Sequence, residues 1–188
     1  MQFLRLVRLS GLLLLLFGGA FPGLIWAVAQ LMPARAAGSP LTVGGRVVGF
    51  RYIGQKFSQA RYFQGRPSAV DYNAAATGAS NLSATSPVLL AQVKARLDTF
   101  LLQNPGVRAA DVPIELLTAS GSGLDPDLSP QGALVQVARV AQARRIPVAQ
   151  LQDLVRQQTT GPWLGFVGPT HVNVLALNLA LDQLAARR

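Results

Sequence analysis

The most apolar part of the chain is a stretch of 24 residues without a single charge, from Leu9 to Met32. Arg5 and Arg8 precede this stretch and Arg35 follows it. Because a helix rises about 1.5 Å per residue, roughly 20 apolar residues cross the ~30 Å hydrocarbon core of a bilayer. The pattern therefore predicts a basic tail over residues 1–8, a transmembrane helix over 9–32 and an extramembrane domain over 33–188.

Small residues cluster inside the predicted span, at Gly18, Gly19 and Gly23. Small side chains let a second helix approach closely within a membrane. We therefore expect these glycines to form a packing face for a membrane partner, with the lipid bilayer around the rest of the helix.

A cleaved signal peptide is the alternative interpretation, because Ala34-Arg35-Ala36 has the small-x-small form of a cleavage site. The apolar region of a signal peptide is roughly 7 to 15 residues long, whereas this one continues through Trp26 and Val28. The length favours a membrane span. The short N-terminus with two arginines favours a cytoplasmic N-terminus and an extracytoplasmic domain in the cell (inner) membrane, crossed once.

Hydrophobic periodicity and turn signals in the remainder predict a single α+β domain. Ser-Pro pairs and isolated prolines mark helix starts, and Gly-rich or Asn-rich runs mark loops. The expected elements are a strand or hairpin over 43–52, a long polar loop over 55–87, a helix from Pro87 through Leu101, a strand over 114–118, helices over 130–145 and 147–158, a strand over 163–167, and a C-terminal helix carrying Val174, Leu177, Leu181 and Leu184.

Composition narrows the chemistry that the chain can perform. It has no cysteine and a single histidine, His171, so thiolate metal sites, a cysteine nucleophile and a His-rich metal site are excluded. The formal net charge is +9, yet no aromatic residues interleave the arginines at 139, 144, 145 and 156, so we expect no nucleic-acid partner. These arginines are interpreted as a solvated helix face.

The loop over 119–130 holds the main candidates for a binding site. Ser120, Gly121, Ser122 and Gly123 lie between a predicted strand and a predicted helix, where backbone N–H groups can cradle an anion such as a nucleotide phosphate. A structural turn is the alternative, because the Lys-Ser/Thr pair of a P-loop is missing. Asp125 and Asp127 are interpreted as turn-forming residues, since further oxygen ligands for a hard cation are missing at calcium-loop spacing.

A serine hydrolase would need Ser120 or Ser122 as the nucleophile and His171 as the base. The chain has no G-x-S-x-G nucleophile elbow. We therefore expect no catalytic residue, and His171 is interpreted as a hydrogen-bonded structural residue.

Several separate strings, among them GRVVGFRYIGQKF at 45–57 and LGFVGPTHVNVLALNLALD at 164–182, follow one another along essentially the whole chain. Together they resemble the C subunit of the Kdp-type potassium-transporting P-type ATPase. Two of the strings are specific: Gly65-Arg66-Pro67-Ser68, and TASGSGLDP at 118–126, which contains Leu124, Asp125 and Pro126. Asn81 lies in a third string, GASNLSATSP at 78–87. The chain departs from the family pattern at Ala74 and at Pro169-Thr170, which we interpret as loop drift.

The resemblance implies a non-catalytic accessory subunit of a high-affinity, ATP-driven potassium uptake complex. Its implied partners are a channel-like potassium-binding subunit and an ATP-hydrolysing P-type subunit, whose assembly it would stabilise. The family is also described as a catalytic chaperone that raises the ATP affinity of the pump subunit, so residues 120–123 are the candidate nucleotide contact, with no cofactor of the chain's own. No ATP is available to a domain outside the cytoplasm, which makes assembly the simpler role. The alternative is a membrane-anchored binding domain or hydrolase unrelated to transport.

Overall fold

The computed structural model describes residues 2–186, which form one N-terminal helix and one mixed α/β domain. The chain divides into two compact units, residues 1–40 and 41–188. The second unit combines helices with a small antiparallel sheet. The expected α+β class is therefore confirmed.

The N-terminal unit is an uninterrupted apolar helix from Gln2 to Gln30, long and apolar enough to cross a membrane. It comprises α1 (Gln2–Leu15), a π-helical turn (Leu16–Ala20) and α2 (Phe21–Gln30), and the short α3 (Pro33–Ala36) follows. The wider turn directly precedes Pro22, whose ring and missing N–H disturb regular α-helical bonding. The helix begins seven residues before the predicted span, so it includes most of the expected basic tail.

The domain opens with a hairpin made of β1 (Pro40–Val43) and β2 (Arg46–Phe50). Gly44 and Gly45 connect the strands with φ angles of 56° and 79°, which suit the tight turn of a two-residue hairpin. The strand or hairpin predicted over 43–52 is thus a hairpin, and it begins three residues earlier than expected. Residues 51–86, all of which the structure describes, then contain neither helix nor strand, in agreement with the predicted long loop.

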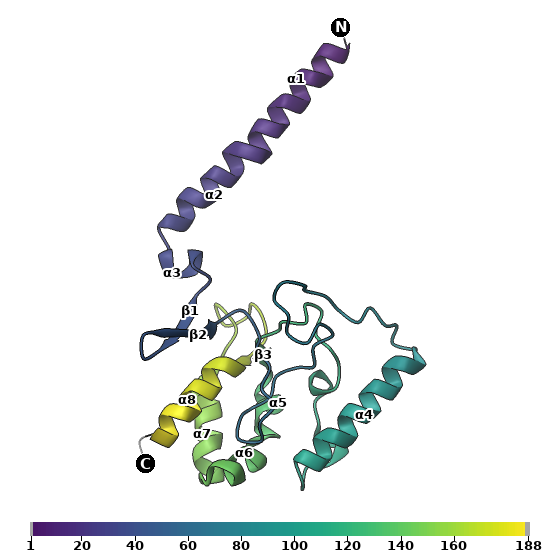
Figure 1. Ribbon diagram of the computed structural model, residues 1–188, viewed down its shortest axis with the longest axis vertical. Helices are drawn as coiled ribbons and strands as arrows, with labels where there is room; N and C mark the ends of the chain where they lie inside the picture. The colour runs from purple at the N-terminus through teal and green to yellow at the C-terminus, as the bar shows by residue number, and fades with distance from the viewer. Residues whose placement is uncertain (1, 187–188) are drawn as a thin grey trace. The chain divides into compact units, whose positions relative to one another are not determined.

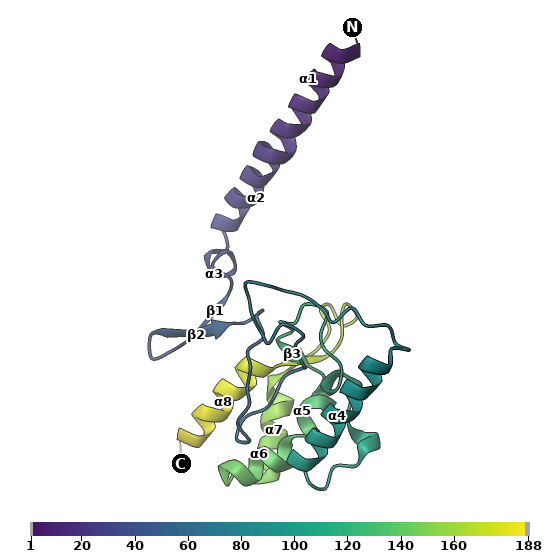
Figure 2. The same cartoon turned by 45° about the vertical axis from the view of Figure 1, so that its right-hand side comes forward.

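Helices and a three-stranded sheet form the rest of the domain. The helices are α4 (Pro87–Gln103), α5 (Pro130–Leu134), α6 (Val137–Arg144), α7 (Val148–Gln158) and α8 (Val174–Ala186). β5 (His171–Asn173) lies between β3 (Asp127–Leu128) and β4 (Thr159–Thr160), antiparallel to both, and Val172 faces Leu128 and Thr159. Figures 1 and 2 show α7 beside α8, with α4 at the opposite side of the domain.

The helix starts at Ser86-Pro87 and Ser129-Pro130 are confirmed, because both serines occupy the N-cap position. The Ser129 side chain accepts a hydrogen bond from the Gly132 amide at 3.0 Å, which satisfies one of the free N–H groups of the first turn. The helix predicted over 130–145 is divided into α5 and α6 at Val135 and Gln136.

Both predicted strands outside the hairpin are wrong. Residues Ile114–Leu116 form a 3₁₀ helix, because the amides of Leu117 and Thr118 bond back to the Ile114 carbonyl and bury the adjacent Leu116 and Leu117. A strand would send those two leucines to opposite faces. Residues 163–167 form an exposed turn closed by a single bridge between Trp163 and Val167, with Leu164 and Gly165 at positive φ.

Two hydrophobic clusters make the core of the domain. The larger cluster lies among α5 to α8 and is built on Val140, Leu151, Val172, Leu177 and Leu181. The smaller one joins α4 to residues 112–117, to β3 and to the start of α8, through Phe100, Val112, Leu116, Leu117, Leu128 and Val174. Phe63, from the middle of the long loop, is fully buried in the larger cluster, so this loop is part of the core.

Buried polar side chains hold the long loop in place. The solvated position expected for Arg139 is wrong, because this side chain of α6 is only 6% exposed and donates to the carbonyl oxygens of Ala60 (2.6 Å) and Tyr62 (3.0 Å). Its other hydrogen bonds go to the side-chain oxygens of Asn104 and Gln136. Burial without a carboxylate lowers the pKa of Arg139 to about 10, so these neutral acceptors provide the stabilisation that a buried charge requires.

Candidate functional site

The structure brings together the two loops that the sequence singled out, residues 65–68 and 120–126. The Ser120 amide donates to the Pro67 carbonyl oxygen at 3.0 Å. Arg66 Nη1 lies 2.9 Å from Asp125 Oδ2, in an ion pair whose side chains are each about one-quarter exposed. These contacts join segments more than 50 residues apart into one structural unit.

Tyr72 stabilises the first of these loops through two hydrogen bonds. Its hydroxyl donates to the Arg66 carbonyl oxygen at 2.5 Å, and its amide donates to Ser68 Oγ at 2.9 Å. Burial is the main reason that the pKa of Tyr72 rises to about 12, and the nearby Asp125 charge adds to the shift while Arg66 opposes it. The phenol is therefore neutral near pH 7 and remains a hydrogen-bond donor. Gly65 lies so close to it that a Cβ at residue 65 would come within 2.8 Å of the Tyr72 hydroxyl oxygen.

The Gly-Ser segment, residues 120–123, is partly buried and partly exposed. Ser120 and Gly123 are buried, whereas Gly121 and Ser122 are exposed. Gly123 has φ +71°, and a Cβ there would come within 2.5 Å of Val70 and 3.0 Å of the Gly78 carbonyl oxygen. Ser122 accepts hydrogen bonds from the amides of Leu124, through Oγ, and Gly78, through its carbonyl. The contribution of residues 120–123 to nucleotide binding stays a prediction.

The remaining signature residues anchor the second loop to its surroundings. The carbonyl of buried Leu124 accepts from the Gly54 amide at 2.8 Å, and the carbonyl of Pro126 accepts from the Val174 amide at 2.9 Å. Asp125 Oδ1 accepts from the Asp127 amide at 3.1 Å, which is the Asx-turn geometry expected of this residue type. Asn81, by contrast, is exposed and has a φ angle of +52°.

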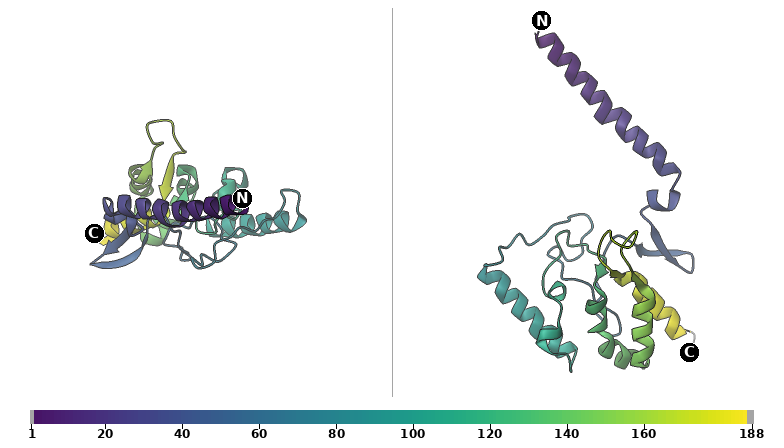
Figure 3. Two further views of the ribbon diagram at one scale, coloured as in Figure 1. Left: turned by 90° about the horizontal axis from the view of Figure 1, so that it is seen from above. Right: turned by 180° about the vertical axis from the view of Figure 1, so that it is seen from behind.

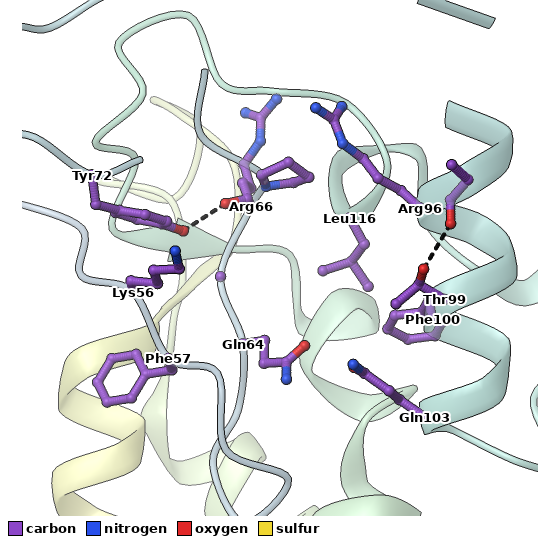
Figure 4. Close-up of a pocket in the computed structure, with 13 residues that line it drawn as sticks. Lys56, Phe57, Gln64, Arg66, Tyr72, Arg96, Thr99, Phe100, Gln103 and Leu116 are labelled. Atoms are coloured by element: carbon purple, nitrogen blue, oxygen red, sulfur yellow. Dashed lines mark hydrogen bonds between the residues drawn. The ribbon is translucent and has the colours of Figure 1, made fainter. Parts of the chain in front are cut away.

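A basic cavity of about 360 Å³ lies beside the first loop, between it and α4 (Figure 4). Lys56, Arg66 and Arg96 line it together with Tyr72, and no carboxylate among the described residues does so. Gln64 and Gln103 contribute amide groups, while Phe57 and Leu116 contribute apolar surface. The signature strings contained Gly65, Arg66 and Pro67, and the string at 45–57 ends in Lys56 and Phe57, whereas Arg96 matches no recognisable motif.

A second cavity, of about 430 Å³, is acidic and lies on the other side of Arg66. Glu115, Asp125, Asp127 and His171 line it. Each carboxylate already accepts a hydrogen bond: Glu115 from Ser129, Asp125 from the Asp127 amide and Asp127 from Asn173. Within residues 2–186, no group of three His, Cys, Asp or Glu side chains is placed to hold a metal ion.

Ser122 and His171 do not form a nucleophile–base pair. Ser122 Oγ accepts the Leu124 amide at 3.0 Å, and His171 Nδ1 lies 3.2 Å from the Pro169 carbonyl oxygen. A serine nucleophile requires its base within hydrogen-bonding reach. The bonds that these two side chains make are therefore structural ones.

Apolar side chains are exposed at the turn between β4 and β5, which we call the apolar tip (residues 163–167). The exposed fractions are 70% for Trp163, 65% for Leu164 and 79% for Phe166. In the left view of Figure 3 this segment extends away from the helices of the domain. Sequence reasoning treated this apolar run as a strand, since exposure cannot be read from the residue types alone.

The three glycines of the N-terminal helix leave its surface open. A Cβ at Gly19 or Gly23 would meet no atom within 4 Å, and one at Gly18 would meet only Leu14, at 3.8 Å. No described residue of α1, the π-helical turn or α2 is buried. The glycine face is thus free to receive another helix.

Comparison with known proteins identifies the family. Residues 3–183 match the family described as KdpC, K⁺-transporting ATPase, c chain. A potassium-transporting ATPase KdpC subunit of Nitratidesulfovibrio vulgaris is 50% identical over 98% of both chains, and that of Methylobacterium nodulans is 47% identical over the whole of both. The corresponding subunit of Flavobacterium psychrophilum is 46% identical over 95% of this chain and 96% of its own. The chain therefore belongs to the KdpC family, as its signature strings indicated.

Proposed function

We propose that the chain is a non-catalytic accessory subunit of an ATP-driven potassium uptake complex. Its role is to stabilise the association of a channel-like, potassium-binding subunit with an ATP-hydrolysing P-type subunit. The observation that carries this proposal is the apolar tip, where three large side chains are each at least 65% exposed. An apolar cluster of this kind on a folded domain is typical of a surface that another protein covers.

The apolar tip is suited to docking because its base is fixed. β4 and β5 flank the turn and pair antiparallel, with Thr160 opposite His171. Gly165 and Gly168 have φ angles of 82° and 86°, which glycine adopts without strain. A turn held in one shape loses little conformational entropy on binding, so more of the binding energy of Trp163 and Phe166 stabilises the complex.

The N-terminal helix supplies the second proposed contact, through Gly18, Gly19 and Gly23. Helix association within lipid depends on close packing, which these glycines permit. We expect the double variant Gly19→Leu/Gly23→Leu to lose co-purification with the channel-like subunit. Phe21→Leu/Ile25→Leu has the same spacing on another face of the helix and serves as the control. Unchanged co-purification of the glycine variant would remove this contact from the proposal.

The domain is proposed to lie outside the cytoplasm, and the absence of cysteine makes this testable. Ser58 and Ser122 are exposed, so Ser58→Cys or Ser122→Cys can each report accessibility to a membrane-impermeant thiol reagent in intact cells. We expect labelling without lysis. Labelling that requires lysis would place the domain in the cytoplasm and contradict the proposed orientation.

An extracytoplasmic domain would raise the pump subunit's affinity for ATP through assembly, without touching nucleotide. The complex should then show the same dependence of ATPase activity on ATP concentration with Gly121→Ala as with the unchanged chain, because Gly121 is exposed and bears on no neighbour. A raised KM for ATP in this variant would favour direct contact through residues 120–123 instead.

A further inference from the structure

The basic cavity between the first signature loop and α4 contains more positive charge than the chain itself neutralises. Two of its three cations have carboxylate partners: Lys56 pairs with Asp71 at 2.6 Å, and Arg66 pairs with Asp125 at 2.9 Å. Within residues 2–186, Arg96 has no ion-pair partner. A half-buried guanidinium group without a counter-ion carries a desolvation cost that a bound anion would remove.

Arg96 is held in place by neutral acceptors only. Its Nη1 donates to the Leu117 carbonyl oxygen at 2.9 Å, and its Nη2 lies 3.5 Å from Gln92 Oε1, one turn earlier in α4. These contacts orient the guanidinium group but use few of its five N–H donors. The guanidinium group of Arg96 is therefore held in position while several of its N–H donors remain available for a ligand.

Arg66 is also only partly satisfied. Asp125 occupies Nη1, and Nε is buried without a hydrogen-bond partner. Figure 4 shows the guanidinium groups of Arg66 and Arg96 extending in the same direction on the two sides of the cavity. The side chains come from separate elements, the loop and the helix, and both elements are fixed by hydrogen bonds between Tyr72 and Arg66 and between Arg96 and Leu117.

We infer that this cavity binds the phosphate group of a small anionic ligand between Arg66 and Arg96. Phosphate fits better than carboxylate because its oxygens are arranged tetrahedrally and can face two guanidinium groups that come from different elements, whereas a planar carboxylate matches a single guanidinium fork. The volume of about 360 Å³ exceeds that of the phosphate alone, so atoms attached to it can lie along Phe57 and Leu116. The phosphate is supplied either by a free ion or by the headgroup of an anionic phospholipid.

Titration of the purified full-length chain in an uncharged detergent tests the inference. Sodium phosphate is added up to about 10 mM at constant ionic strength, in a buffer without other oxyanions, and heat is recorded by calorimetry. In a parallel arm, the chain is placed in phosphatidylcholine nanodiscs with or without phosphatidylglycerol, and retained lipid is measured by native mass spectrometry. Binding in the first arm identifies free phosphate as a ligand, and selective retention in the second identifies the headgroup.

Two substitutions and one control separate the cavity from general surface charge. Arg96→Gln should weaken binding in the positive arm at least about tenfold, since it removes a charged donor pair. Arg96→Lys keeps the charge and a donor for Leu117 but loses the fork, so its affinity should be intermediate. Arg108→Gln removes an arginine that is 80% exposed and outside the cavity, and its affinity should equal that of the unchanged chain.

The inference is overturned if neither phosphate nor phosphatidylglycerol binds. It is equally overturned if Arg96→Gln and Arg108→Gln bind as tightly as each other. Should Arg96→Gln fail to fold, Arg96→Lys decides, because an affinity equal to that of the unchanged chain would rule out recognition by the guanidinium fork. The result is independent of the proposed assembly role, since no partner subunit is present in either arm.

Discussion

The side-chain amide of Asn178 forms two hydrogen bonds with the backbone of Phe63, which lies 115 residues away in the sequence. Asn178 Oδ1 accepts the Phe63 amide at 2.9 Å, and Nδ2 donates to the Phe63 carbonyl oxygen at 2.9 Å. Gln136 does the same for Gln64, at 2.9 and 3.0 Å. Two buried amide side chains thus replace the neighbouring strand that this extended segment lacks.

Asn178→Leu should therefore destabilise the domain more than the small change in side-chain volume suggests. The substitution is close to isosteric but leaves the buried N–H and C=O of Phe63 without partners. We expect the free energy of unfolding to fall by about 2–4 kcal/mol, measured by urea denaturation of the full-length chain in detergent and followed by circular dichroism. Gln131→Leu, at an exposed position of α5, should change it by no more than about 0.5 kcal/mol. Equal effects of the two variants would show that the paired amide is unimportant.

Gly121 and Gly123 offer a matched comparison within one short segment. Gly123→Ala requires a positive φ and brings Cβ within 2.5 Å of Val70, so we expect a loss of at least about 2 kcal/mol. Gly121→Ala meets no atom within 4 Å, and its stability should stay within about 0.5 kcal/mol of the unchanged chain. Thermal unfolding of the two variants measures the difference. Similar melting temperatures would contradict the close contact between the signature loops.

Tyr72 predicts a loss of stability at alkaline pH. Its pKa in the folded chain is about 12, whereas that of an unfolded tyrosine is about 10. From pH 10 to 12 the unfolded chain loses the phenol proton while the folded chain keeps it, so the folded state becomes less stable by about 1–2 kcal/mol as pH rises; below pH 10 the contribution is fully present.

The absorbance of phenolate near 295 nm measures this directly, because the chain has only three tyrosines. The unchanged chain should show a late titration phase around pH 12, where the pKa of Tyr72 lies, and Tyr72→Phe should lack that late phase. Loss of an early phase in the variant would mean that the Tyr72 phenol is not buried as described.

Local signals predicted the helices well, and non-local pairing accounts for the errors. The starts of α4 and α5 follow from Ser86-Pro87 and Ser129-Pro130, whose capping chemistry acts within one turn. The strands of the central sheet have only two or three residues each, too few for an alternating pattern, and they exist because β3 and β4 both meet β5. The sequence predicted a strand at 163–167, yet in the described part of the domain this run is a turn with exposed apolar side chains.

The candidate site was predictable only in part. The sequence marked Gly65 to Ser68 and Ser120 to Pro126 separately, but the bond from the Ser120 amide to Pro67 is a product of the tertiary fold. Arg96 gave no signal at all, because a single arginine on a helix is usually a solvated residue. Its significance comes from the loop that the buried amide side chains place opposite it.

We propose that exposed apolar surface on this chain holds a potassium-transporting complex together. The most direct test is co-purification of the channel-like and ATP-hydrolysing subunits with Trp163→Ser/Phe166→Ser, compared with Leu90→Ser/Leu102→Ser, which changes two exposed leucines on α4. At equal amounts of membrane-inserted chain, the tip variant should lose most of the recovered complex while the α4 variant retains it. Full recovery of both partner subunits with the tip variant would contradict the claim.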